Sequence, residues 1–216
     1  MTINLKKRIY TSFGLLFLLS LMFIDNFALG YFLIVIGILS FLEFAKIIQI
    51  TSKKNKFFQL VYSLLFLTYI FLFCYLFFIF SFHLNLKIII FLFLIVCIVS
   101  DIAGFIFGKT FKGPKLTKIS PNKTISGFVG SLLLSGTFSF FSIYYITNSF
   151  DYFGIVVGFG ISIACQVGDL FFSFLKRSSS LKDTGNILPG HGGVLDRIDG
   201  ILFGLPVGFL ILLLFY

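Results

Sequence analysis

The chain has 216 residues, of which 58% are hydrophobic and 12% charged, and its mean hydropathy is +1.08. Soluble domains carry about 25% charged residues, so this composition excludes a soluble globular protein and indicates an integral membrane protein. The net charge of +9 would favour nucleic-acid binding in a soluble protein. Basic residues in a membrane protein instead flank the spans and set their orientation, so we expect no nucleic-acid partner.

Apolar runs recur along the whole chain, and a helix needs about 20 apolar residues to cross a bilayer. They predict an all-α, polytopic membrane protein with about seven spans, six to eight being compatible with the softer boundaries. The chain is expected to form a single membrane domain, 1–216. In chain order the runs cover about 9–24, 28–50, 57–80, 88–107, 127–147, 152–175 and 198–216.

The first run follows a basic segment, as a signal peptide does, but no small-residue cleavage site follows it, so we expect an uncleaved first span. With seven spans and a cytoplasmic N-terminus, all of the 17 basic residues except Lys87 fall on the cytoplasmic side. This asymmetry predicts a cytoplasmic N-terminus and an external C-terminus. The expected location is the inner (cytoplasmic) membrane of a bacterium.

The second run contains an acidic residue, Glu43, with Lys46 one helical turn further on. An i,i+3 ion pair near the membrane interface is the simple interpretation.

Acidic residues gather at the predicted cytoplasmic ends of the fourth, sixth and seventh runs. An ionised carboxylate such as Asp169, after an uncharged stretch, is unfavourable unless it is paired or bound to a cation. A salt bridge to another span and a metal site both remain open. Asp196 and Asp199 are spaced to face the same way on a helix. Carboxylates that converge without His or Cys suggest Mg²⁺, which usually also holds substrate phosphates.

Two loops have the features of phosphate sites. The sequence "PGHGG", with His191 at its centre, offers backbone amides to an anion and leads into a helix N-terminus. Lys123 and Thr124 stand just ahead of the fifth run, in a similar position. The residues alone therefore predict a site for Mg²⁺ and phosphate at the cytoplasmic interface, suited to phosphoryl or nucleotidyl transfer to a lipid.

The stretch "SFLKRSSSLKDTGNILPGHGGVLDRID", 173–199, resembles the signature of the phosphatidate cytidylyltransferase (CDP-diacylglycerol synthase) family. Every signature position is filled. The segment "SDIAGFIFGKTFKGPKLTKISPNKTISG" is similar to the middle region of the family. The resemblance covers 101–206, which would be the catalytic core, whereas 1–100 is similar only in being hydrophobic. The chain differs from the usual family pattern at Ser126 and Gly200.

The resemblance implies that CTP and phosphatidate react to give CDP-diacylglycerol and pyrophosphate, with Mg²⁺ as cofactor, in phospholipid biosynthesis. It implies a multi-pass enzyme in the lipid bilayer. Members of the family form homodimers, so the resemblance is also compatible with a homodimer of this chain. Whether a second, monovalent cation takes part stays open. Asp169 and Asp196 would hold the metal. The catalytic set would be Asp169, Asp196, Asp199, Lys176 and Arg177. The substrate-binding set would be Ser173, Lys123, Lys182, Asp183, His191, Gly192, Gly193, Arg197 and Asp101.

Three alternatives remain open. A CDP-alcohol phosphotransferase would carry an Asp-Gly-x-x-Ala-Arg pattern, which the sequence lacks. A transporter would place charges near mid-membrane or use broken helices, whereas the acids here gather toward one face. The third alternative is an inactive relative that serves as a structural membrane protein.

Overall fold

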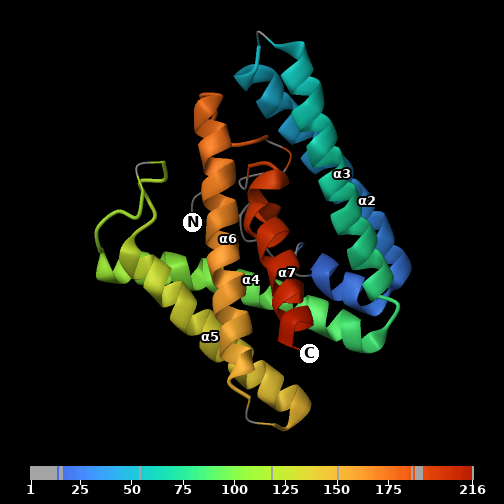
Figure 1. Cartoon of the computed structure of the whole chain (residues 1–216), viewed down its shortest axis with the longest axis vertical. Coiled ribbons are helices and arrows are strands. Elements are labelled where there is room, and N and C mark those ends of the chain that lie inside the picture. Colours follow the sequence, from blue (N-terminus) through green and yellow to red (C-terminus); the bar gives the residue numbers. More distant parts are fainter. Residues whose placement is uncertain are drawn as a thin grey trace. The chain divides into compact units, whose positions relative to one another are not determined.

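The computed structural model describes residues 14, 17–53, 55–117, 119–149, 151–185, 187 and 192–215, and these form helices joined by loops, with no strand among them. The all-α prediction is confirmed. The long helices are α2 (Asn26–Thr51), α3 (Lys56–Phe80), α4 (Leu84–Phe111), α5 (Ile125–Thr147), α6 (Phe153–Ser178) and α7 (Leu195–Phe215) (Figure 1).

Each of these six helices is long and apolar enough to cross a membrane. They correspond to six of the seven predicted spans, so the polytopic character is confirmed. Of the first predicted span, residues 9–13, 15 and 16 lie outside the described residues, whereas residues 17–24 are helical.

Helix boundaries follow local capping chemistry. The Asn55 carboxamide oxygen accepts a hydrogen bond from the Phe57 amide (3.1 Å) and begins α3. The Thr124 hydroxyl accepts one from the Gly127 amide (3.1 Å) and begins α5. Such caps satisfy backbone donors that have no partner within the helix. They explain why short polar segments between apolar runs suffice to separate the helices.

The chain divides into two compact units, which we describe separately. Unit 1 comprises Met1–Lys87 and Leu175–Ile198, and unit 2 comprises Ile88–Phe174 and Asp199–Tyr216. Helices α4, α6 and α7 therefore contribute residues to both units. Whether the chain acts as one membrane domain stays a prediction.

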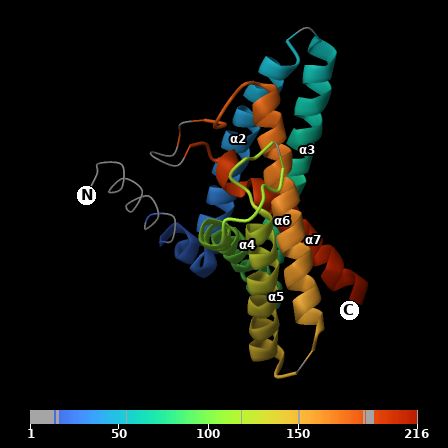
Figure 2. The same ribbon diagram turned by 90° about the vertical axis from the view of Figure 1, so that its left-hand side faces the viewer.

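In unit 1, α2 and α3 lie side by side (Figures 1 and 2). The rings of Phe44 and Phe66 stack with their centroids 3.9 Å apart. At the start of α4, the Lys87 ammonium donates a hydrogen bond to the Asn26 side-chain oxygen (2.6 Å). Lys87, the one basic residue predicted on the external side, is thus held against the N-terminus of α2.

In unit 2, α5 and α6 approach each other closely through small residues (Figure 2). A Cβ atom added at Gly158 of α6 would meet the Ser135 carbonyl oxygen and lie 2.8 Å from the Gly136 Cα atom. Both obstacles are backbone atoms of α5, which cannot rotate away. Small residues that allow backbones to approach are typical of helix contacts in membranes.

We therefore expect Gly158→Ala to separate α5 from α6 and to destabilise the protein by about 1–3 kcal/mol, the usual effect of overpacking. The measurement is the thermal unfolding midpoint in detergent. Gly104→Ala is the matched control in the same unit, because the nearest described atom outside its own helix, the Gly127 carbonyl oxygen, would lie 3.8 Å from the added Cβ. An equal midpoint for both variants would contradict the close packing.

Candidate active site

In unit 2 the centre of the candidate site is an ion pair between Lys123 and Asp169. The Lys123 ammonium lies 2.8 Å from a carboxylate oxygen of Asp169, and the side chains are 26% and 20% exposed. The salt bridge weighed from the sequence for Asp169 is therefore present. Its partner comes from the loop before α5, rather than from another span.

The loop 112–124 is folded so that Lys123 faces α6. Lys115 and Thr124 form an isolated antiparallel bridge, and the Leu116 amide donates to the Lys123 carbonyl oxygen (2.8 Å). The Ile125 amide donates to the Pro114 carbonyl oxygen (2.9 Å). These backbone bonds position Lys123.

A cavity of about 290 Å³ opens beside this pair. Polar and charged side chains from three helices and the loop contribute to it, including Asp101 of α4, Lys123, Asp169 and Gln166. The Gln166 carboxamide donates to the Ser131 hydroxyl. The cavity therefore offers two carboxylates, one ammonium and neutral polar groups among helices that are otherwise apolar.

In unit 2, α7 packs against α6 next to Asp169. A Cβ added at Gly200 would lie 3.0 Å from a carboxylate oxygen of Asp169, so a larger residue here would press on that carboxylate. The neighbouring Asp199 carboxylate accepts a hydrogen bond from the Gly200 amide (3.0 Å). Gly200, one of the two departures from the family pattern, thus leaves space next to Asp169.

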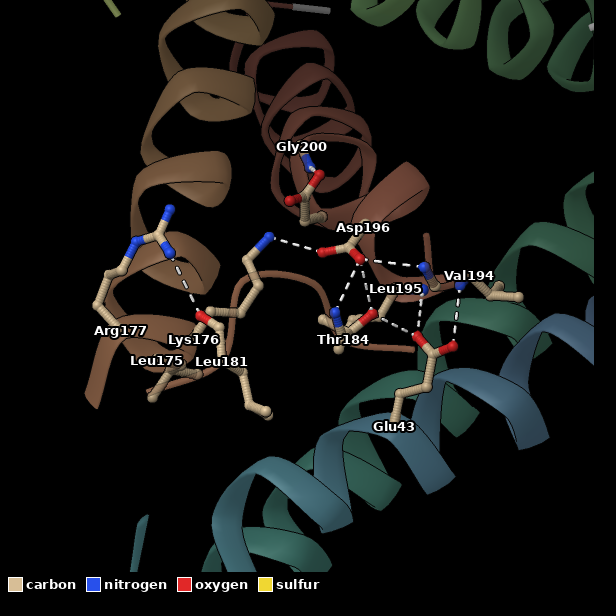
Figure 3. Close-up of polar contacts among 12 residues, drawn as sticks. Glu43, Leu175, Lys176, Arg177, Leu181, Thr184, Val194, Leu195, Asp196 and Gly200 are labelled. Atoms are coloured by element: carbon tan, nitrogen blue, oxygen red, sulfur yellow. Dashed lines mark hydrogen bonds and ion pairs between the residues drawn. The ribbon is translucent and has the colours of Figure 1, made fainter. Parts of the chain in front are cut away.

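Unit 1 contains a second ion pair, between Lys176 at the end of α6 and Asp196 at the start of α7 (Figure 3). The Lys176 ammonium lies 2.6 Å from Asp196 Oδ1, and the side chains are only 12% and 9% exposed. A pair with so little solvent contact is held strongly only if its remaining oxygens are also hydrogen-bonded.

The other Asp196 oxygen meets this requirement. Asp196 Oδ2 accepts from the Thr184 amide (2.9 Å), the Gly193 amide (3.1 Å) and the Thr184 hydroxyl (3.0 Å). Lys176 and the two amides thus give this carboxylate three donors, and the Thr184 hydroxyl, which also lies within reach of Glu43, is the fourth donor group near it. Asp196 therefore ties both ends of the loop between Thr184 and Gly193 to α7.

Glu43 of α2 reaches the same loop (Figure 3). Its carboxylate accepts from the Thr184 hydroxyl (2.7 Å) and from the Val194 (3.0 Å) and Leu195 (2.9 Å) amides. Lys46 is exposed. The predicted Glu43–Lys46 ion pair is wrong, because donors far away in the sequence satisfy Glu43 more completely than one lysine on the same helix surface.

The remaining predicted residues are placed less centrally. The Arg177 guanidinium donates to the Leu181 carbonyl oxygen (3.3 Å), and Gly192 has a φ of 84°. His191 lies outside the described residues. Ser173 is half-buried on α6, whereas Lys182, Asp183 and Arg197 are exposed.

The donor set in unit 2 suits Mg²⁺, which takes oxygen ligands and commonly one or two carboxylates together with water and phosphate. Asp101 and Asp169 supply such oxygens to one cavity. Asp196 suits a metal less well as arranged, because protein donors already surround it. The described part of the chain contains no group of three or more His, Cys, Asp and Glu that could hold a metal.

Glu43, Thr184 and Gln166 were not among the predicted site residues. A signal existed for Glu43, since an acidic residue within an apolar span is by default a functional candidate. Thr184 and Gln166 gave none, because the contacts that set them apart, with Glu43 and with Ser131, join residues 141 and 35 positions apart in the sequence.

Comparisons with known proteins agree with the motif. The family model described as "Cytidylyltransferase family" matches residues 6–215, a wider region than 101–206. The phosphatidate cytidylyltransferase of Rickettsia bellii (strain RML369-C) is 42% identical over 125 residues, which cover 53% of this chain and 54% of that protein.

Two further relatives carry the same name. That of Helicobacter pylori (strain ATCC 700392 / 26695) is 41% identical, over 51% of this chain and 41% of that protein. That of Mycobacterium leprae (strain TN) is 38% identical, over 50% of this chain and 35% of that protein. The chain spans about half, or less, of the length of these curated relatives.

The Lys123–Asp169 pair gives a prediction about stability. Lys123→Met leaves the Asp169 carboxylate without its ammonium, and we expect the free energy of unfolding to fall by about 1–3 kcal/mol. Asp169→Asn should also destabilise the protein. The double variant should lose less than the sum, with a coupling of about 0.5–3 kcal/mol. Unfolding in detergent measures all three, and strictly additive losses would contradict the pairing.

Proposed function

The chain belongs to the cytidylyltransferase family, and from this premise we propose that it transfers the cytidylyl group of CTP to phosphatidate. The products would be CDP-diacylglycerol and pyrophosphate, and the reaction would serve phospholipid biosynthesis. The observation that carries the proposal is the complete signature from Ser173 to Asp199. The names of the relatives support the same reaction.

The chemistry is a displacement at phosphorus. A phosphate oxygen of phosphatidate forms a bond to the α-phosphorus of CTP, and the bond from that phosphorus to the bridging oxygen breaks. Pyrophosphate leaves with the electron pair. Because the attacking phosphate is already ionised near neutral pH, no strong general base is needed. Catalysis then consists mainly of positioning and charge neutralisation.

The cations of the site suit this task. Lys123 lines the cavity of unit 2 together with Asp101 and Asp169. Lys176 binds Asp196, which also accepts a hydrogen bond from the Gly193 amide. Both are paired with carboxylates in this structure. We infer that they exchange these partners for substrate phosphates. Arg177, His191, Gly192 and Gly193 would contribute further donors to the triphosphate.

Mg²⁺ would be held by Asp169, with Asp101 lining the same cavity, and Asp196 is the further ligand that the signature implies. The ion would neutralise phosphate charge as bonds form and break. We propose these metal ligands, and we also propose that the protein forms a homodimer.

The test uses detergent-purified protein, phosphatidate, Mg²⁺ and CTP labelled at the α-phosphate. We expect label to enter a chloroform-soluble product. Asp169→Asn and Asp196→Asn should each reduce the rate by at least about 100-fold, as loss of a charge-stabilising group does. Chelation of Mg²⁺ should stop transfer, and its return should restore it.

Ser40→Ala is the matched control for these variants, because Ser40 is buried in α2 and its hydroxyl has no hydrogen-bond partner among the residues that the structure describes. Intact wild-type protein that transfers no label, while an authentic synthase works in the same assay, would overturn the proposal. An inactive relative would then be the better reading.

We also propose an orientation in which the loop 112–124 faces the cytoplasm of a bacterial inner membrane. Lys115→Cys and Ser149→Cys place exposed thiols before and after α5. In spheroplasts an impermeant maleimide should label Ser149→Cys, and Lys115→Cys only after lysis. The wild type is the blank, since Cys97 and Cys165 are buried and Cys74 is half-buried. The reverse pattern would invert the orientation.

A further inference from the structure

Glu43 places a carboxylate in an unusual environment. It lies in α2 and is 5% exposed. Among the described residues its hydrogen-bond partners lie more than 140 positions away in the sequence. A buried carboxylate seldom adds stability compared with an apolar residue of the same size. Its presence therefore calls for another explanation, and the hydrogen bonds supply one.

Two of the donors lie at the start of α7: the amide of Val194, which directly precedes the helix, and that of Leu195, its first residue. The Val194 and Leu195 amides have no partner within the helix, and Val194 carries no polar side chain that could cap it. Glu43 provides both acceptor oxygens from a different helix (Figure 3). Its negative charge also suits the positive end of the α7 dipole. Glu43 thus acts as the N-terminal cap of α7.

The third donor, the Thr184 hydroxyl, lies at the opposite end of the loop. Glu43 therefore holds both the residue at which the loop 184–193 begins and the residues that directly follow it. Asp196 bonds to the same two ends. Together the two carboxylates close the loop at its base.

Two glycines are fitted around Glu43. A Cβ added at Gly185 would lie 2.6 Å from Glu43 Oε1, and one added at Gly193 would lie 2.7 Å from the same oxygen. A real Cβ essentially never comes this close. The backbone at Gly185 and at Gly193 therefore lies so close to the Glu43 carboxylate that no side chain fits between them.

We propose that Glu43 is a positioning residue for nucleotide binding. Its carboxylate holds Thr184, Val194 and Leu195 in place, and so positions the Gly193 amide, Lys176 and Asp196 for the triphosphate of CTP. The triphosphate contact rests on the proposed function. The anchoring of the loop does not, so the two can be tested separately.

The first experiment follows amide hydrogen exchange by mass spectrometry in a peptide that contains Val194 and Leu195. Loss of the acceptor in Glu43→Ala should speed exchange there by about tenfold or more. Ser40→Ala, one turn earlier on α2, should leave exchange unchanged. Unaltered exchange in Glu43→Ala would overturn the anchor.

The second experiment measures the KM for CTP. A positioning role predicts that Glu43→Ala raises this KM by about tenfold or more. A purely structural role would lower kcat through loss of active protein and leave KM unchanged, so that result overturns positioning. Glu43→Gln keeps one acceptor oxygen and should lie between wild type and Glu43→Ala.

Thr184 provides an independent variant should Glu43→Ala fail to fold. Thr184→Val removes the hydroxyl and should raise the KM for CTP, whereas Thr184→Ser keeps it and should restore the wild-type value. A KM that is the same for Val and Ser would overturn the proposal. If the wild type transfers no label, the proposed function fails, while the exchange measurement still decides whether Glu43 anchors the loop.

Discussion

An ionised carboxylate among apolar helices must receive hydrogen bonds or a counter-ion, because its removal from water is otherwise strongly unfavourable. This constraint organises both units. In unit 1, Glu43 accepts hydrogen bonds from Thr184 and from Val194 at the start of α7, and Asp196 binds Lys176. In unit 2, Asp169 forms an ion pair with Lys123 of the loop before α5. Within each unit, several of the polar contacts between distant parts of the chain thus involve one of these acids.

The helical architecture could be predicted from the sequence because bilayer thickness imposes a length on every span. Each described helix overlaps a predicted run, and caps such as Thr124 lie where the runs break. What periodicity cannot reveal is which face of a nearly uniform apolar helix meets a neighbour. The close approach of Gly158 to α5 depends on that choice, and composition contains no record of it.

The candidate site was predictable where chemistry is local and not where it is distant. The signature marked Lys176 and Asp196 as functional, but their mutual ion pair depends on the fold. For Glu43 a neighbour in sequence, Lys46, offered an obvious partner. The structure instead gives it three donors from across the chain, because a buried carboxylate gains more from several short hydrogen bonds than from one exposed lysine.

The Thr184 hydroxyl lies 2.7 Å from an oxygen of Glu43 and 3.0 Å from an oxygen of Asp196. A hydroxyl carries a single hydrogen, so it can donate to one of these acids at a time. Rotation about the Cβ–Oγ bond moves the hydrogen bond from one acid to the other without displacing a heavy atom. A cation or phosphate that changes the charge around Asp196 would bias this rotation. Binding of such an ion at the start of α7 would thereby change the hydrogen bonding of Glu43 in α2.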